Sequence, residues 1–196
     1  AAIAMTEKLK IAVVLGSVRE GRQGIKAAKY IINELKKRGH HILFIDPLEY
    51  PLPLLEKRYK EFEQGKAPHL LEKLHTIFLE SDAIVLVSAE YNHSIPPALS
   101  NMLDYFMEEF THKPSAIVSY SGGTFGGVRA AVQLREMVAE LGMPSIPKVL
   151  AIVKVHEAFD NDGNDLTKMY EDRTQKFLEE LEWYAHALKN HSAKSP

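Results

Sequence analysis

The feature that most constrains the fold of this chain is the alternation of short apolar runs with amphipathic segments along its length. The run Lys10–Leu15 is continuous, rich in β-branched residues and closed by Gly16, as expected of a parallel strand buried on both faces. The segment 25–38 has apolar residues three and four positions apart and ends at Gly39, which predicts an amphipathic helix. The same patterns predict further strands at 42–45, 83–87, 116–120 and 148–155, and further helices at 70–79, 97–110, 128–141 and 166–188.

Strands that alternate with single helices form βαβ units, and the right-handed crossovers of such units give a parallel sheet with helices on both faces. The sequence therefore predicts an α/β fold, a doubly wound three-layer sandwich around a five-stranded parallel sheet. The least regular part of the chain is 47–68, which contains four prolines and a charged stretch. Long connections of this kind in compact domains are often functional or mobile.

The charge balance limits the classes of partner. The chain has 24 Lys and Arg against 26 Asp and Glu, a net charge of −2, so it has no overall positive field and we expect no nucleic-acid partner. The longest apolar runs are strand-sized, and we expect no membrane span. The absence of cysteine excludes disulfides, thiolate metal sites and cysteine nucleophiles, and it favours a reducing compartment, the cytoplasm.

A length of 196 residues is typical of one domain with a single core. We expect that domain at residues 9–190, between tails at 1–8 and 191–196. Ala1–Ala4 precede Met5 and are typical of residues added for expression, so we expect the natural chain to start at Met5.

In an open parallel sheet, ligands bind outside the carboxyl ends of the strands, where the strand order reverses. The first loop at that edge, residues 16–24, contains three glycines together with Ser17, Arg19 and Arg22. Such a loop favours phosphate binding, because it combines close backbone approach, free N–H groups at a helix start and positive charge. The loop is neither a Walker loop nor a G-x-G-x-x-G motif, because Val18 stands at the second glycine position. An ordinary glycine-rich turn is the alternative.

Two further strand ends carry polar groups. Asp46 ends the second strand, where an acid would meet a ribose hydroxyl, although an Asp-Pro turn explains it equally well. The loop after the third strand can hold the edge of a flat heterocycle, and ordinary turn chemistry before a helix is the alternative. Its candidate residues are Glu90, Tyr91, Asn92 and His93.

The fourth strand is followed by four glycines within six residues, which indicates backbone close under a ligand or a partner chain. A hydrolase with Ser121 as nucleophile is the alternative, but the G-x-S-x-G motif requires glycine where Ser119 stands. The nine histidines include no His-Glu-x-x-His spacing, and the pair His40-His41 lies at the opposite end of the sheet. We therefore expect no metal site.

These loops together resemble a known family. Three motifs carry the resemblance, in order and one per loop: Gly16-Ser17-Val18-Arg19, Glu90-Tyr91-Asn92 before Ile95-Pro96, and Ser119-Tyr120 with the Gly-Gly repeats. Over residues 10–155 the chain is similar to NADPH-dependent FMN reductases and quinone reductases of flavodoxin-like fold. Leu99, Asp104 and Leu134-Arg135 also match.

The resemblance implies that residues 9–190 are one FMN-binding domain. The first loop would hold the FMN phosphate through Ser17, Arg19, Arg22, Gln23 and Gly24. The isoalloxazine edge would meet Glu90, Tyr91, Asn92 and His93, and its pyrimidine side would meet Tyr120, Ser121, Gly122 and Gly123. The chain departs from the family pattern at Ala89, Ser100 and Arg22-Gln23-Gly24, where many relatives have Pro, Lys and Ser-x-Asn.

The implied activity has two steps. NADPH or NADH would reduce FMN at N5, leave, and be replaced by a quinone, free flavin, azo dye or metal oxyanion. The flavin carries this chemistry, so we assign no catalytic acid or base. A flavin-binding electron-transfer module without turnover, and a nucleotide-binding or hydrolytic α/β domain, are the alternatives.

The resemblance also implies a homodimer or a larger homo-oligomer. The predicted helix at 97–110 is apolar on more than one face, which is compatible with an interface. Burial of this helix beneath the last helix of the chain explains the same pattern equally well.

Overall fold

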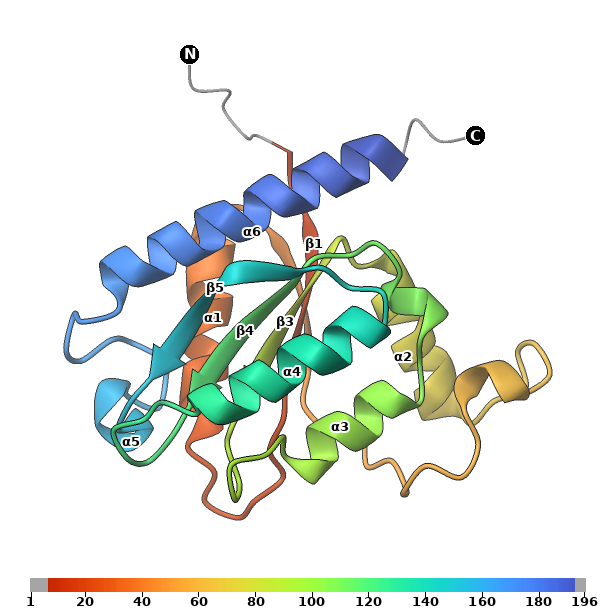
Figure 1. The fold of residues 1–196 in the computed structure, drawn as a ribbon, viewed down its shortest axis with the longest axis horizontal. Helices are drawn as coiled ribbons and strands as arrows, with labels where there is room; N and C mark the ends of the chain where they lie inside the picture. Colours follow the sequence, from red (N-terminus) through yellow and green to blue (C-terminus); the bar gives the residue numbers. More distant parts are fainter. Residues whose placement is uncertain (1–6, 193–196) are drawn as a thin grey trace.

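Five parallel strands form the centre of the computed structural model, which describes residues 7–192 (Figure 1). They pair in the order β2-β1-β3-β4-β5, the order of a doubly wound sheet, and this confirms the predicted α/β three-layer fold. The expectations about Met5 and the outermost residues of both tails lie outside the described range. The strands are β1 (Lys10–Leu15), β2 (His41–Ile45), β3 (Ala83–Ser88), β4 (Ser115–Tyr120) and β5 (Ser145–Ile152).

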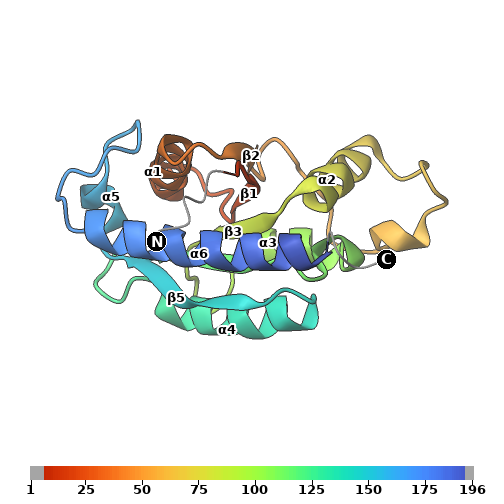
Figure 2. The same cartoon turned by 90° about the horizontal axis from the view of Figure 1, so that it is seen from above.

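Helices cover both faces of the sheet, and Figure 2 shows α1 and α2 on opposite sides of β1 and β2. Helices α1, α5 and α6 bury their apolar residues in one core, and α2, α3 and α4 bury theirs in the other. Every residue of β3 and β4 is buried, as their continuous apolar runs predict. The helices are α1 (Gly24–Lys37), α2 (His69–Glu80), α3 (Pro97–Asp104), α4 (Val128–Glu140), α5 (Val155–Ala158) and α6 (Glu171–Ser192), with short turns η1 (Tyr59–Glu61) and η2 (Glu108–Phe110).

The helix predicted at 97–110 is shorter than expected, because α3 ends at Asp104 and only 108–110 form a further turn. Between these elements the chain bends and places the rings of Tyr105, Phe106 and Phe110 in the core. The large apolar side chains of this segment are therefore mostly buried within the chain itself. They pack with α2 and the sheet and not beneath α6, which covers the opposite face.

The C-terminal third also departs from the prediction. Strand β5 starts at Ser145 and tolerates Pro147, because an edge strand pairs on one side only. It ends at Ile152, before the predicted end at 155, and residues 155–158 form α5. Helix α6 begins at Glu171 and not at 166, because the Asp165 carboxylate accepts N–H groups from Thr167, Lys168 and Tyr170 and holds the preceding residues in a turn.

The irregular segment 47–68 is fastened to α2 and α3. Asn101 of α3 accepts the Leu55 N–H at 2.9 Å and donates to the Pro53 carbonyl at 2.8 Å. The Tyr59 hydroxyl donates to Glu72 of α2 at 2.8 Å. The segment therefore covers the flank of the molecule.

Among residues 7–192, no helix is both long and apolar enough to cross a membrane.

Candidate cofactor-binding groove

The strand order reverses at β1 and β3, so the loops that leave these strands diverge at the carboxyl edge of the sheet. A hollow of about 310 Å³ opens there, which we name the carboxyl-edge groove. The loops after β1, β3 and β4 and the start of α5 form its walls. It is lined by Ser17, Arg19, Glu20, Gly21, Arg22, Gln23, Ala89, Glu90, Tyr91, Tyr120, Ser121, Gly122, Val155 and His156.

The wall after β1 can receive an anion. The Ser17 hydroxyl is buried, lies 2.8 Å from the Tyr91 hydroxyl and accepts the Arg19 backbone N–H at 3.3 Å. The Arg19 guanidinium lies 5.6 Å from the centre of the Tyr91 ring. Helix α1 begins at Gly24, and Gln23 at its N-cap makes no side-chain capping bond to the first turn. N–H groups at a helix start carry partial positive charge, so this wall combines them with a full charge.

Arg22 lines the same wall, and its guanidinium is paired with Asp46. Its two terminal nitrogens donate to the two Asp46 carboxylate oxygens at 2.6 and 2.5 Å, and one of them also donates to the Ser17 carbonyl at 2.7 Å. The hydrogen bond to Asp46 raises the pKa of Arg22. Burial alone would raise the pKa of Asp46, but hydrogen bonds from Arg22 and the Leu48 N–H, with the charge of Arg22, hold it below its usual range. Both groups therefore stay ionised.

The wall after β3 is a tight turn. The Tyr91 and Ser94 backbones exchange hydrogen bonds at 3.2 and 3.0 Å, and Asn92 and His93 between them have φ values of 52° and 62°. A positive φ at both central positions is typical of the two-residue type I′ turn that joins hairpin strands. Glu90 braces this turn against α4, because its carboxylate accepts the Ala130 N–H at 2.8 Å. The turn therefore fixes a rigid edge to the groove.

The wall after β4 exposes glycine backbone, which no side chain covers, to the groove. A Cβ atom added at Gly122 or Gly123 would meet nothing within 4 Å, so a ligand can approach this backbone closely. The Ser121 hydroxyl accepts the Gly126 N–H at 2.9 Å and donates to the Gly123 carbonyl at 3.0 Å. It shapes the loop through backbone bonds, and no histidine base is among these partners.

Tyr120 connects the first and last walls. The residue is 6% exposed, and its hydroxyl lies so close to α1 that a Cβ atom at Gly24 would come within 1.9 Å of it. Burial raises the pKa of Tyr120 well above its ordinary value, with the nearby Tyr91 adding to the effect and a hydrogen bond to Ser17 opposing it. The phenol therefore stays neutral, and the packing of Tyr120 against α1 requires glycine at position 24.

The structure brings most of the predicted site residues together. Gly24 lies behind the groove against Tyr120, Asn92 lines a neighbouring hollow with Arg19 and Tyr91, His93 lies at the turn, and the Gly123 carbonyl accepts the Lys154 N–H at 2.9 Å. The predicted set did not include Glu20, Gly21, Ala89, Val155 and His156, which also line the groove. For Val155 and His156 the available signal was their position at the end of the fifth predicted strand. Within residues 7–192, no group of three or more His, Cys, Asp or Glu side chains is placed to hold a metal ion.

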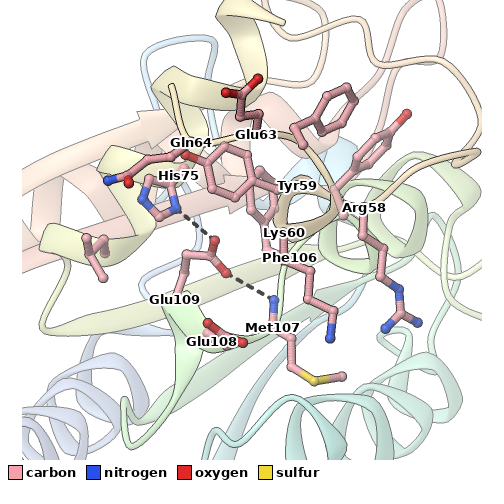
Figure 3. A pocket seen from close by; sticks show the side chains of 13 residues that line it. Arg58, Tyr59, Lys60, Glu63, Gln64, His75, Phe106, Met107, Glu108 and Glu109 are labelled. Atoms are coloured by element: carbon pink, nitrogen blue, oxygen red, sulfur yellow. Dashed lines mark hydrogen bonds and ion pairs between the residues drawn. The ribbon is translucent and has the colours of Figure 1, made fainter. Parts of the chain in front are cut away.

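A second hollow, which we name the flank pocket, lies between η1, α2 and η2 and has a volume of about 390 Å³ (Figure 3). None of the residues that line it lines the carboxyl-edge groove. Part of its polar lining is paired within the chain. Glu109 accepts hydrogen bonds from His75 at 2.7 Å and from the Met107 N–H at 3.1 Å, and Tyr59 stacks on His75 with 4.2 Å between ring centres.

Three comparisons describe what the chain is similar to. Residues 9–157 match the family model of NADPH-dependent FMN reductase. A probable NADPH:quinone oxidoreductase 2 of Oryza sativa subsp. japonica is 31% identical, with 95% of this chain and 94% of that protein covered. An NADPH azoreductase of a Bacillus strain is 28% identical over 92% of this chain and 95% of the azoreductase. In fold, the flavoenzyme NAD(P)H:(acceptor) oxidoreductase FerB of Paracoccus denitrificans matches with a TM-score of 0.74 at 21% identity, covering 91% of this chain and 98% of FerB.

Proposed function

Because the chain belongs to the NADPH-dependent FMN reductase family and is an FMN-dependent NAD(P)H oxidoreductase, we propose that its carboxyl-edge groove is where FMN binds. The observation that carries this proposal is the meeting of a guanidinium, a helix start and open glycine backbone in one groove. A phosphate needs the first two, and a flat ring needs the third.

The phosphate would lie against the wall after β1. Ser17 offers a hydroxyl, Arg19 a charged guanidinium, and Gln23 and Gly24 the start of α1. Charge-assisted hydrogen bonds of this kind are roughly twice as strong as neutral ones. Arg22 borders the same wall, with its guanidinium joined to Asp46.

The isoalloxazine ring would lie between the other two walls. Glu90 to His93 would form one edge of its site, and Tyr120 to Gly123 would lie along its pyrimidine side. When bound, FMN supplies the redox chemistry by taking a hydride from NADPH or NADH and passing electrons to an acceptor. The backbone N–H groups near Gly122 and Gly123 would stabilise negative charge at the pyrimidine oxygen, as preorganised donors do.

The proposal extends to the acceptor, the domain bounds, the compartment and self-association. The acceptor is a small molecule, a quinone, free flavin, azo dye or metal oxyanion, and the names of the relatives above include quinone and azo compounds. We propose that residues 9–190 are the FMN-binding domain, that the protein works in the cytoplasm, and that it forms a homodimer or larger homo-oligomer. Support for self-association comes from the loop before α4 and its outer face, where Phe125, Val128 and Val132 are 66%, 42% and 61% exposed.

The test is reconstitution of the full chain with FMN, followed by anaerobic titration with NADPH. We expect a yellow protein whose flavin spectrum bleaches with NADPH and recovers when a quinone is added. A chain that refuses FMN would overturn the proposed site. A chain that binds FMN but is not reduced by NADPH would instead be an electron-transfer module without turnover.

A further inference from the structure

The pairing of Arg22 with Asp46 links the loop after β1 to the end of β2. Side-chain exposure is 12% for Arg22 and 10% for Asp46, so solvent screens this ion pair little. Both carboxylate oxygens are engaged by the two terminal guanidinium nitrogens, at 2.6 and 2.5 Å. Asp46 is itself oriented by the turn that follows it, since its carboxylate accepts the Leu48 N–H at 2.9 Å.

This arrangement leaves Arg22 unsuited to act as a free positive charge for a phosphate. Its charge is balanced by a carboxylate in direct contact, and two of its donors are used by that carboxylate. Arg22 still borders the groove, so its sequence position alone does not distinguish a ligand from a support.

The third bond made by Arg22 indicates what the pair does. Arg22 donates to the Ser17 carbonyl at 2.7 Å and holds that oxygen on its own side of the loop. The peptide that follows is trans, as are all peptides in residues 7–192, so its N–H points the opposite way from the carbonyl. A carbonyl oxygen turned toward a phosphate would repel it, whereas an N–H would attract it.

We propose that Arg22 and Asp46 are positioning residues that hold the Ser17 carbonyl out of the anion site and keep the loop after β1 in its phosphate-binding form. Neither side chain contacts the phosphate in this scheme. The inference rests on the proposed function, because it requires the phosphate of FMN at this wall. It assigns to the end of β2, which does not line the groove, a part in cofactor affinity.

The test compares FMN with riboflavin, which lacks the phosphate, on the full chain freed of bound flavin. The main variant is Arg22→Gln with Asp46→Asn, which removes the ion pair and keeps the net charge. We expect its FMN dissociation constant to rise at least fivefold while that for riboflavin stays within twofold of the wild type. The matched control is Arg38→Gln with Glu182→Gln, which removes another partly buried ion pair, between the end of α1 and α6. It should keep the wild-type ratio of the two affinities.

The single variant Asp46→Asn separates positioning from direct contact by the sign of its effect. Loss of a negative charge near the phosphate would by itself favour FMN. We nevertheless expect FMN to bind at least threefold more weakly, because the loop loses its support. Tighter or unchanged binding would overturn the proposal, as would a double variant with the wild-type ratio. If the wild type itself does not prefer FMN to riboflavin, the proposed phosphate site fails instead.

Discussion

The carboxyl-edge groove and the flank pocket are two hollows of comparable volume, about 310 and 390 Å³, whose polar groups are used in different ways. In the flank pocket the His75 ring, the Glu109 carboxylate and the Tyr59 hydroxyl are all paired within the chain. In the groove, the start of α1 has no side-chain cap, and the backbone at Gly122 has open space beside it.

The two hollows have similar volumes and therefore differ mainly in the polar groups that they offer a ligand. Buried polar groups that satisfy one another stabilise the fold, and they have little left to offer a ligand. The groove is the smaller hollow, yet it lies where the strand order reverses and gathers donors on one side. The flank pocket results from the fastening of segment 47–68 to α2 and α3. Substitutions in the groove should therefore change flavin affinity, whereas substitutions in the flank pocket should change only the stability of the fold.

The largest effect is expected at Gly24. Gly24→Ala places a Cβ atom within 1.9 Å of the Tyr120 hydroxyl, in a packed region where the ring cannot yield freely. Overpacking of this kind costs about 1–3 kcal/mol, and we expect the free energy of unfolding to fall by that amount in urea titrations. FMN affinity should fall more than tenfold, because the wall after β1 must move.

Gly122→Ala is the control for this prediction. Its Cβ atom meets no protein atom within 4 Å, so stability should stay within about 0.5 kcal/mol of the wild type. Flavin binding should nevertheless weaken, because the added methyl group enters the space proposed for the ring. Wild-type FMN affinity in Gly24→Ala would show that Tyr120 does not fix this wall.

A charge reversal at Arg19 should have the next largest effect. Arg19→Glu replaces an attraction for the phosphate by a repulsion, and we expect FMN to bind at least tenfold more weakly, about 1.4 kcal/mol. Fluorescence titration of the apoprotein measures this change. Lys60→Glu, the same change of charge at the flank pocket, should leave the affinity unaltered. Equal losses in both variants would mean that net charge, and not the groove, controls binding.

In the flank pocket, Glu109→Gln should lower stability and leave flavin binding unchanged. The carboxylate is buried and accepts two hydrogen bonds, from His75 and from the Met107 N–H. We expect a loss of about 1 kcal/mol of unfolding free energy, the size of a typical net hydrogen-bond contribution, with unchanged FMN and riboflavin affinities. A selective loss of FMN affinity would contradict the separation of the two hollows.

The sequence predicted the groove better than the flank, for a physical reason. Strands such as Lys10–Leu15 and Ala83–Ser88 are buried on both faces and read as continuous apolar runs, and the loops at their ends follow from the parallel topology. The three loops of the groove therefore could be located from local patterns alone, and most of the expected residues line it.

The remaining features depend on contacts between residues far apart in the chain. The partner of Arg22 is Asp46, which directly follows β2, and nothing local in the sequence distinguishes this pairing from a free arginine. The end of α3 at Asp104 follows from the burial of Phe106 against Phe78, whose ring centre lies 5.3 Å away. The late start of α6 follows from the hydrogen bonds that Asp165 accepts from the turn after it. Local periodicity carries no information about any of these partners.

The smallest expected effect is at Tyr59 of the flank pocket, and its pH dependence gives it a distinct signature. Tyr59→Phe removes the hydrogen bond to Glu72 and should cost about 0.5–1.5 kcal/mol of unfolding free energy near neutral pH.

Burial, with the hydrogen bond and charge of Glu72 adding to it, raises the pKa of Tyr59 to about 12. In the unfolded chain the phenol ionises near its ordinary pKa of 10.0. The folded state therefore binds more protons than the unfolded state between these values, and the stability contributed by Tyr59 is complete below pH 10 and is lost as the pH rises toward 12. The difference in stability between the wild type and Tyr59→Phe should accordingly narrow over this interval in urea titrations, since the other tyrosines are common to both proteins. A difference that stays constant would show that Tyr59 is solvated, and a change in the ratio of FMN to riboflavin affinity would show that the flank pocket communicates with the groove.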